Sequence, residues 1–297
     1  MPGYALPSMH SSMSVSRARL SAYRAQTYRT ATKLRVRTQA EAIRFVSDRG
    51  FAYFWPIQGV EMPSLWAAVA GDRPVASAHD DPGHVTWGWK DALLGTGVWH
   101  YARVLRGKAT LVAPEVVPLF YALSENFGEP REDAENLYRA GALSREAFRV
   151  LEILLDQGRQ HTITLRREAG LTARTANTRF ERALTELQMH WLIAPVAVAQ
   201  AGAWRYAFVY DTVTRAWPGL VAAAGAITRS EARVRLLELY LQSVGVGGLT
   251  GLQKLFRWTK PHLQTALETL VAQGCIVPVE AFGDQKGPAW ATLALVA

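Results

Sequence analysis

Residues 79–91, HDDPGHVTWGWKD, gather two tryptophans, two histidines, three aspartates and a lysine within thirteen positions. Titratable groups beside flat indole rings are what a pocket for a planar ligand such as a nucleobase needs. The alternative is a loop that caps a helix whose tryptophans anchor the core. If residues 84–95 are helical, Trp87 and Trp89 cannot share one face, because residues two apart on a helix point in different directions.

The same segment offers side chains that can bind metals, but their pattern does not favour a metal. His79, Asp81 and His84 lack the ligand spacing of known metal sites. The aspartates also fit capping and turn positions, and Lys90 with Asp91 fits an ordinary exposed ion pair. We therefore expect no metal and no cofactor.

The composition is that of a globular protein without a membrane segment. The 297 residues are 49% hydrophobic and 20% charged, enough for two or three small domains. No run approaches the roughly 18 to 20 apolar residues that cross a bilayer. The single cysteine, Cys275, excludes an intrachain disulfide framework and fits a reducing cytoplasm. We expect a cytoplasmic protein, associated with the nucleoid.

The positive charge is concentrated at the start of the chain. Of the net charge of +8, residues 1–37 carry +7 without one acidic residue, so residues 38–297 are nearly neutral. This arm has no continuous apolar run, which predicts a disordered extension or an over-long start. The functional alternative is a basic arm that follows DNA phosphates.

An internal repeat predicts the fold. Residues 180–196 and 263–279 align without gaps at an offset of 83 and are identical at six of 17 positions. In both copies apolar residues recur at the spacing of a helix with one buried face, followed by a β-branched run that contains Pro195 or Pro278. Proline suits an edge strand.

The order of helix, short helix, longer helix and hairpin is that of a winged helix-turn-helix. The sequence predicts a mainly helical α+β fold of tandem winged helices, with two clear units and a third, degenerate one at the N-terminal side. The unit boundaries expected from the sequence are 38–128, 144–211 and 229–297, with a linker helix at 129–143. In the first unit, residues 62–71 are expected to form a short helix with Pro63 in its first turn, and a hairpin is expected to turn at Arg106-Gly107.

A winged helix binds duplex DNA by placing its third helix in the major groove. Arginine and asparagine suit phosphate and base-edge contacts. In the second unit the candidate DNA-binding residues are Arg166, Arg167, Arg174, Asn177 and Arg179. The expected partner is double-stranded DNA.

Several motifs resemble a known family. FWPIQGVEMPSLWAAVAG, HVTWGWKD, WRYAFVYD and the three-unit layout are similar to the bacterial winged-helix DNA glycosylases of the AlkZ type, and most similar to a branch described as related to them. The resemblance covers residues 36–297. It implies tandem winged helices that encircle DNA, and excision of alkylated or crosslinked purines in DNA repair.

The family's catalytic signature is a glutamine, an apolar residue and then aspartate or glutamine, ahead of a helix. Here the stretch reads Gln58-Gly59-Val60-Glu61. Either Gln58 matches the first glutamine and Val60 occupies the second polar position, or Val60 and Glu61 match the last two positions and Gly59 replaces the glutamine. Both alignments depart from the signature at one position.

Hydrolysis of an N-glycosidic bond builds positive charge on the sugar, which a carboxylate can stabilise while it activates water. Glutamine can orient the water, and aromatic side chains can stack on an extruded base. The catalytic candidates are Gln58, Glu61 and Asp91, and the candidates for a base pocket are Trp87, Trp89 and Lys90. Lys90 can also form a Schiff base if it is desolvated.

Three hypotheses follow. The first is a DNA glycosylase in which Glu61 or Asp91 is the acidic group. The second is a winged-helix DNA binder without enzymatic activity, such as a transcriptional regulator, and the third is a protein-interaction module. Whether Gln58, Glu61 and Asp91 line one cleft is the structural observation that would discriminate most between these hypotheses.

Overall fold

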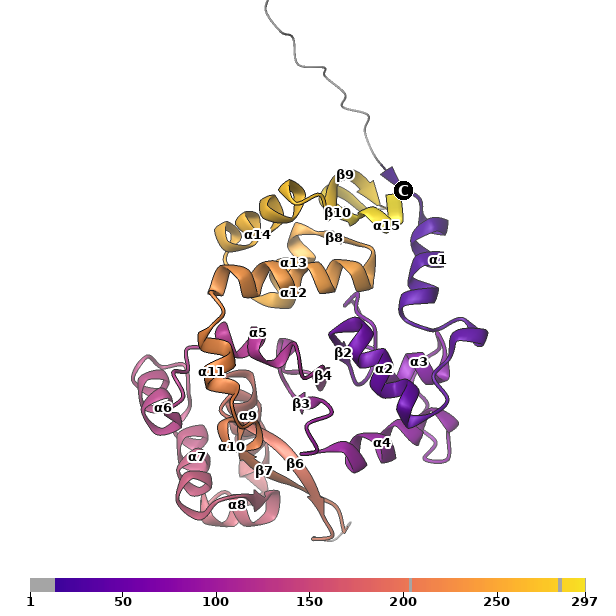
Figure 1. Cartoon of the computed structure of the whole chain (residues 1–297). Helices are drawn as coiled ribbons and strands as arrows, with labels where there is room; N and C mark the ends of the chain where they lie inside the picture. The colour runs from indigo at the N-terminus through magenta and orange to yellow at the C-terminus, as the bar shows by residue number, and fades with distance from the viewer. Residues whose placement is uncertain (1–13, 203–204, 283–284, 297) are drawn as a thin grey trace, which may run out of the picture.

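The computed structural model describes residues 14–202, 205–282 and 285–296. The fold contains three copies of one arrangement, in which a helix, a short strand and further helices precede a β-hairpin. We call residues 39–112 repeat 1, residues 145–212 repeat 2 and residues 229–292 repeat 3. Figure 1 shows repeat 3 above repeats 1 and 2, which lie side by side.

Repeat 1 begins at a capping box in which Thr38 and Glu41 satisfy each other's backbone N–H groups. Its hairpin turns at Arg106-Gly107 as predicted, and both residues have positive φ, at 53° and 66°. Pro63 does not lie in the first turn of the short helix, because Ser64 caps that helix by accepting a hydrogen bond from the Ala67 N–H. The elements are α2 (Gln39–Arg49), β2 (Phe51–Tyr53), α3 (Leu65–Ala70), η2 (Pro82–His84), α4 (Val85–Leu93), β3 (His100–Ala102), η3 (Leu105–Gly107) and β4 (Thr110–Val112).

Repeats 2 and 3 keep the offset of 83 that the sequence shows. Repeat 2 contains α7 (Arg145–Gln157), β5 (Gln160–His161), α8 (Thr162–Glu168), η4 (Arg174–Ala176), α9 (Asn177–Met189), β6 (Ile193–Ala199) and β7 (Ala207–Thr212). Repeat 3 contains α12 (Arg229–Val244), β8 (Val246–Gly248), α13 (Leu249–Phe256), α14 (Lys260–Ala272), β9 (Ile276–Phe282) and β10 (Gln285–Thr292). Both ends of α9 and α14, and of β6 and β9, differ by 83 residues.

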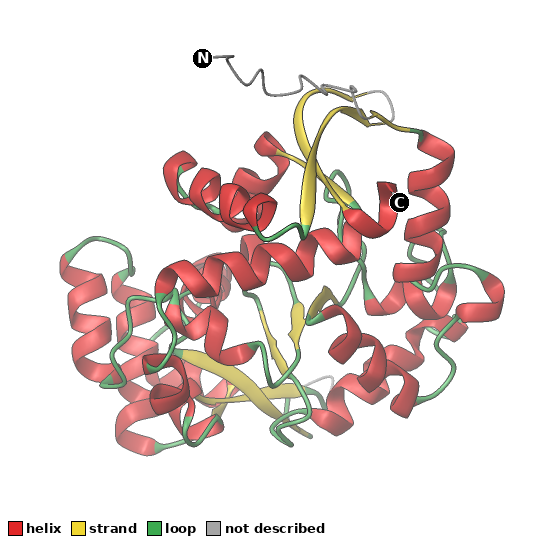
Figure 2. Cartoon of the chain, turned by 45° about the horizontal axis from the view of Figure 1, so that its top comes forward, coloured by secondary structure: helices red, strands yellow, loops and turns green. Residues whose placement is uncertain are grey.

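The three sheets share one topology. In each, the short strand after the first helix pairs antiparallel with the second strand of the hairpin, which gives the orders β2-β4-β3, β5-β7-β6 and β8-β10-β9. Figure 2 shows the sheet of repeat 3 apart from those of repeats 1 and 2, whose strands β3 and β6 are in contact. Pro195 lies on the edge strand β6, as predicted. Pro278 lies on β9, where β1 (Ser14–Val15) pairs in parallel only with Ala281 and Phe282, so among the described residues the outer edge of β9 has no strand partner at Pro278.

The prediction of a disordered arm is wrong for the part of the arm that the structure describes. After β1, Ser16 caps α1 (Arg17–Thr27), and η1 (Thr32–Leu34) follows. The helix forms because Val15 and Leu20 are buried against repeat 3, in a small core with Val246 and Leu295. Residues 1–13 of the arm and Trp204 of the WRYAFVYD motif lie outside the described residues.

The hydrophobic core joins repeat 1 to repeat 3. One continuous cluster runs from Phe45 and Leu111 of repeat 1 to Leu237 and Leu267 of repeat 3, whereas most of repeat 2 packs around its own cluster. The connecting helices are α5 (Val117–Ala122), α6 (Pro130–Arg139), α10 (Val213–Ala216), α11 (Leu220–Gly225) and, after repeat 3, α15 (Leu293–Val296). Among the described residues, none of the helices has the length and apolar character that a membrane span needs.

Candidate active site

The loop of residues 54–64, between β2 and α3, carries the altered signature. Two backbone hydrogen bonds close its base: the Tyr53 N–H donates to the Pro63 carbonyl at 2.9 Å, and the Trp66 N–H donates to the Phe54 carbonyl at 3.1 Å. Tyr53 and Phe54 are buried in the core of repeat 1. The loop therefore projects from a rigid base, which fixes where its tip lies.

A tight turn forms the tip of this loop. The Val60 N–H donates to the Ile57 carbonyl at 3.1 Å, and Gly59, the third residue of the turn, has φ of 71°. Glycine adopts this left-handed conformation without steric cost. Gln58 is exposed on the turn, while Glu61 follows it and returns toward repeat 3.

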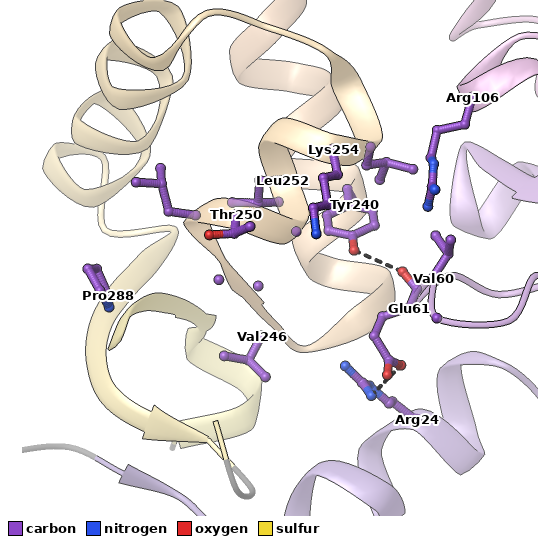
Figure 3. Close-up of a pocket in the computed structure, with 16 residues that line it drawn as sticks. Arg24, Val60, Glu61, Arg106, Tyr240, Val246, Thr250, Leu252, Lys254 and Pro288 are labelled. Atoms are coloured by element: carbon purple, nitrogen blue, oxygen red, sulfur yellow. Dashed lines mark hydrogen bonds and ion pairs between the residues drawn. The ribbon is translucent and has the colours of Figure 1, made fainter. Parts of the chain in front are cut away.

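A cavity of about 390 Å³ lies between this tip and repeat 3. Figure 3 shows Val60 and Glu61 on one side of it and Thr250, Leu252 and Lys254 of α13 on the other. Its lining comprises Arg24, Gly59, Val60, Glu61, Arg106, Tyr240, Val246, Gly247, Gly248, Leu249, Thr250, Gly251, Leu252, Lys254, Leu255 and Pro288. The volume is in the range of small-ligand pockets.

Glu61 is held at two points. The Tyr240 hydroxyl donates to the Glu61 carbonyl at 2.8 Å, and burial raises the pKa of Tyr240, so this phenol keeps its proton. Arg24 of α1 donates through Nη1 to Glu61 Oε2 at 2.6 Å. The Glu61 side chain is 59% exposed, compared with 18% for Arg24. With Arg106 and Lys254, the lining carries three cations around one carboxylate.

Lys90 and Asp91 lie in a different environment. Lys90 is 4% exposed, and its Nζ donates to Asp91 Oδ1 at 2.5 Å and to the Tyr206 hydroxyl of repeat 2 at 2.9 Å. The Tyr206 hydroxyl in turn donates to Asp91 Oδ1 at 2.9 Å. The ammonium also lies over the rings of Phe208, at 4.5 Å, and Tyr101, at 5.1 Å. Burial lowers the pKa of Lys90, while Asp91 opposes that shift.

The prediction of an ordinary exposed Lys90–Asp91 pair is therefore wrong. Aromatic side chains from both repeats enclose the ammonium, which turns the pair into a contact between repeats 1 and 2. Lys90 is desolvated, as a Schiff-base lysine must be, but it is not part of the lining of the 390 Å³ cavity.

The two tryptophans of α4 point in different directions, as predicted. Trp87 is 46% exposed and lies edge-on to Trp55, with 6.0 Å between ring centroids, whereas Trp89 packs partly buried against the core. Asp81 caps η2 by accepting from the Gly83 N–H at 2.8 Å. Hydrogen bonds from Arg73 and from the Gly83 N–H hold the pKa of Asp81 below its usual range.

The catalytic candidates do not share one cleft. Glu61 lines the 390 Å³ cavity, but Gln58, Asp91 and the two tryptophans of α4 do not. The physical reason is that repeat 1 has two neighbours. Its 54–64 loop meets α12 and α13 of repeat 3, while α4 packs against the hairpin of repeat 2.

The candidate DNA-binding residues divide into exposed and structural ones. Arg174, Asn177 and Arg179 are exposed around the start of α9. Arg179 pairs with Glu146 at 3.2 Å, while the side chains of Arg174 and Asn177 have no hydrogen-bond or ion-pair partner within the described part of the chain. Arg167 pairs with its exposed neighbour Glu168.

Arg166 stabilises a turn. Its guanidinium donates to the carbonyls of Leu171, Thr172 and Ala173, which connect α8 to η4. Its role in the structure is therefore to hold the start of α9 in place.

Sequence reasoning missed four residues of the cavity, which are Arg24, Arg106, Tyr240 and Lys254. The signal for Arg24 was Ser16 ahead of RARLSAYRAQT, because serine is a preferred N-cap and predicts a helix there. Arg106 lies at the hairpin turn that the sequence did predict. Among the described residues, no group of three or more His, Cys, Asp or Glu side chains could hold a metal ion.

The topology and the charged cavity define a three-repeat α/β protein with an open polar site between repeats 1 and 3. In a comparison with solved structures, the chain is similar to the DNA glycosylase AlkZ of Streptomyces sahachiroi, with a TM-score of 0.57 and 15% sequence identity. The alignment covers 96% of this chain and 73% of that one, which shows a shared fold.

The sequence model of the AlkZ-related family matches residues 36–257, which is most of the chain. The chain therefore belongs to the AlkZ-related family, and the resemblance inferred from its motifs is confirmed. A comparison with curated proteins gives no match.

Proposed function

We propose that this protein is a DNA glycosylase that hydrolyses the N-glycosidic bond of an alkylated or crosslinked base, with Glu61 as the acidic group. One observation carries the proposal. Glu61 extends from a rigid loop into an open cavity whose other charged residues are cations, in a chain of the AlkZ-related family. Of the two alignments to the catalytic signature, this favours the one that matches Val60 and Glu61.

The proposed chemistry follows from the charge that develops on the sugar. The C1′–N bond breaks and its electron pair leaves with the base, which leaves positive charge on the deoxyribose. The Glu61 carboxylate stabilises that charge and accepts a proton from the water that attacks C1′. A base alkylated on a ring nitrogen is a good leaving group because it already carries positive charge.

Lys254 and Arg106 suit the phosphates of the DNA strand that would enter the cavity. We propose that repeats 2 and 3 are winged helices and that repeat 1 is a degenerate one. The exposed Arg174, Asn177 and Arg179 would then contact the duplex from the start of α9.

The test is single-turnover base excision with a panel of duplexes that carry one alkylated or crosslinked purine. We expect excision by the wild-type protein and none by Glu61→Gln, which keeps the size of the side chain and removes its charge. Equal duplex binding by both proteins is the control for folding.

A DNA binder without enzymatic activity is the second candidate, favoured by the exposed Arg174 and Asn177, whose side chains have no partner among the described residues. Duplex binding without excision of any substrate in the panel would select it over the glycosylase.

A further inference from the structure

The N-terminal helix α1 lies outside the residues 36–257 that match the family, yet it reaches the cavity. It packs on α12 and α15 of the C-terminal part of the chain. The fit is close, because a Cβ atom on Gly245 would lie 2.9 Å from the Tyr23 ring and 3.2 Å from Leu20. The Tyr23 hydroxyl also donates to the Gln242 carbonyl at 2.6 Å.

Arg24 connects this helix to both repeats. Its Nε donates to the carbonyl of Val244, the last residue of α12, at 2.9 Å, while Nη1 donates to Glu61 Oε2 at 2.6 Å. Figure 3 shows Arg24 and the Glu61 carboxylate pointing toward each other beside the cavity. The guanidinium is mostly buried and anchored to backbone, so Glu61, the more exposed partner, takes its position from Arg24.

The pair leaves half of the carboxylate free. Only Oε2 of Glu61 is bound, and Oε1 has no hydrogen-bond partner among the described residues. A charge-assisted hydrogen bond to one oxygen restrains where the carboxylate lies and leaves the other oxygen available to a ligand.

We infer that Arg24 is a positioning residue for Glu61 and that α1 is part of the active site. This inference rests on the proposed glycosylase activity. It assigns to Arg24 the task of holding one carboxylate oxygen so that the other faces the sugar and the attacking water. Misplacement of a reacting group by about 1 Å can lower a rate about 100-fold.

A structural role for Arg24 predicts a different result. If Arg24 only docks α1, then any change that weakens docking should lower excision by a similar factor. Tyr23→Phe provides that control. Tyr23 is next to Arg24 in the chain, and this change removes its hydrogen bond to the Gln242 carbonyl but leaves the Arg24–Glu61 pair in place. Arg19→Met, on the exposed side of the same helix, controls for the loss of one positive charge.

The experiment measures the single-turnover excision rate at saturating protein and, separately, the Kd for a duplex with one N7-alkylated guanine. For Arg24→Met we expect a rate about 100-fold below wild type with Kd changed less than about threefold. The excision rate of Arg24→Lys should be at least about tenfold higher than that of Arg24→Met, because the lysine ammonium can still bind Glu61. Tyr23→Phe and Arg19→Met should stay within about threefold of wild type.

The outcomes separate this inference from the proposed function. A wild-type rate in Arg24→Met, or an equal loss in Tyr23→Phe, would overturn the role of Arg24 and leave the glycosylase proposal standing. No excision by the wild-type protein would overturn both. If Arg24→Met does not fold, the rescue by Arg24→Lys decides: a folded Arg24→Lys protein that binds duplex but has no measurable excision would overturn the inference.

Discussion

Repeat 1 meets its two neighbours through contacts of opposite character. Toward repeat 3 it presents Glu61 in an open cavity, with one carboxylate oxygen bound and the other free. Toward repeat 2 it presents Lys90 and Asp91, enclosed by aromatic rings and bonded to each other and to Tyr206. Both contacts contain a carboxylate and a cation.

The difference lies in what each carboxylate is free to do. Asp91 accepts hydrogen bonds from two donors at one oxygen and is 27% exposed, so its role is to stabilise the contact between repeats 1 and 2. Glu61 is 59% exposed beside a 390 Å³ cavity. The sequence made both of them catalytic candidates, and their accessibility in the structure separates them.

The largest expected effect on stability is at Lys90. Lys90→Ala leaves Asp91 without its ion pair and opens space between four aromatic rings, so the free energy of unfolding should fall by about 3 to 5 kcal/mol. Lys90→Met fills most of that space and should lose less. Chemical denaturation measures both, and a loss below about 1 kcal/mol for Lys90→Ala would show that this contact does not stabilise the fold.

A second buried contact between repeats 1 and 2, made by His100 and Trp191, predicts sensitivity to acid. His100 is stacked on Trp191 at 4.5 Å and accepts a hydrogen bond from Trp217, and burial lowers the pKa of His100 to about 3. The unfolded chain, with an ordinary histidine pKa of about 6.5, binds a proton first as pH falls. This contribution to stability is complete above about pH 6.5 and falls by about 1.4 kcal/mol per pH unit toward pH 3.

His100→Gln removes this titration. The free energy of unfolding, measured by denaturation between pH 6 and pH 4, should then fall less steeply than in the wild-type protein. Equal slopes for the two proteins would contradict a neutral, buried His100.

The same contrast between satisfied and free side chains holds within repeat 2. Arg166→Ala should lower stability by about 1 to 2 kcal/mol, because the carbonyls of the α8–η4 turn lose their donor. Arg174→Ala should leave stability unchanged and reduce the slope of log K against log salt for duplex binding by about one unit. A salt slope that changes only in Arg166→Ala would reverse these assignments.

The elements that the sequence predicts well are those whose signals are local. The helices of residues 180–196 and 263–279 and the Arg106-Gly107 turn depend on periodicity and turn chemistry within a short stretch of chain. Helix α1 was missed because only Leu20 of its eleven residues is buried, and its capping serine is a weak signal within a basic, apolar-poor segment.

The candidate site was harder to predict because its contacts are distant in sequence. Glu61 meets Arg24 across 37 positions and Tyr240 across 179, while Lys90 meets Tyr206 across 116. The identity of Glu61 as a candidate was accessible from the loop sequence. Glu61 and Asp91 lie in different environments because one face of repeat 1 contacts repeat 3 and another contacts repeat 2. The spacing of residues along the chain does not predict which face contacts which repeat.

The most direct test compares Glu61→Gln with Asp91→Asn, two changes that each replace a carboxylate by an amide, in single-turnover excision and in thermal unfolding. The account predicts that Glu61→Gln lowers the excision rate at least about 100-fold with little change in Tm. Asp91→Asn should keep a rate within about threefold of wild type and lower Tm by several degrees, since it weakens a buried pair. The opposite result would contradict the assignment of the chemistry to Glu61. In that case Glu61→Gln would keep the wild-type excision rate, while Asp91→Asn would lose excision and keep the wild-type Tm.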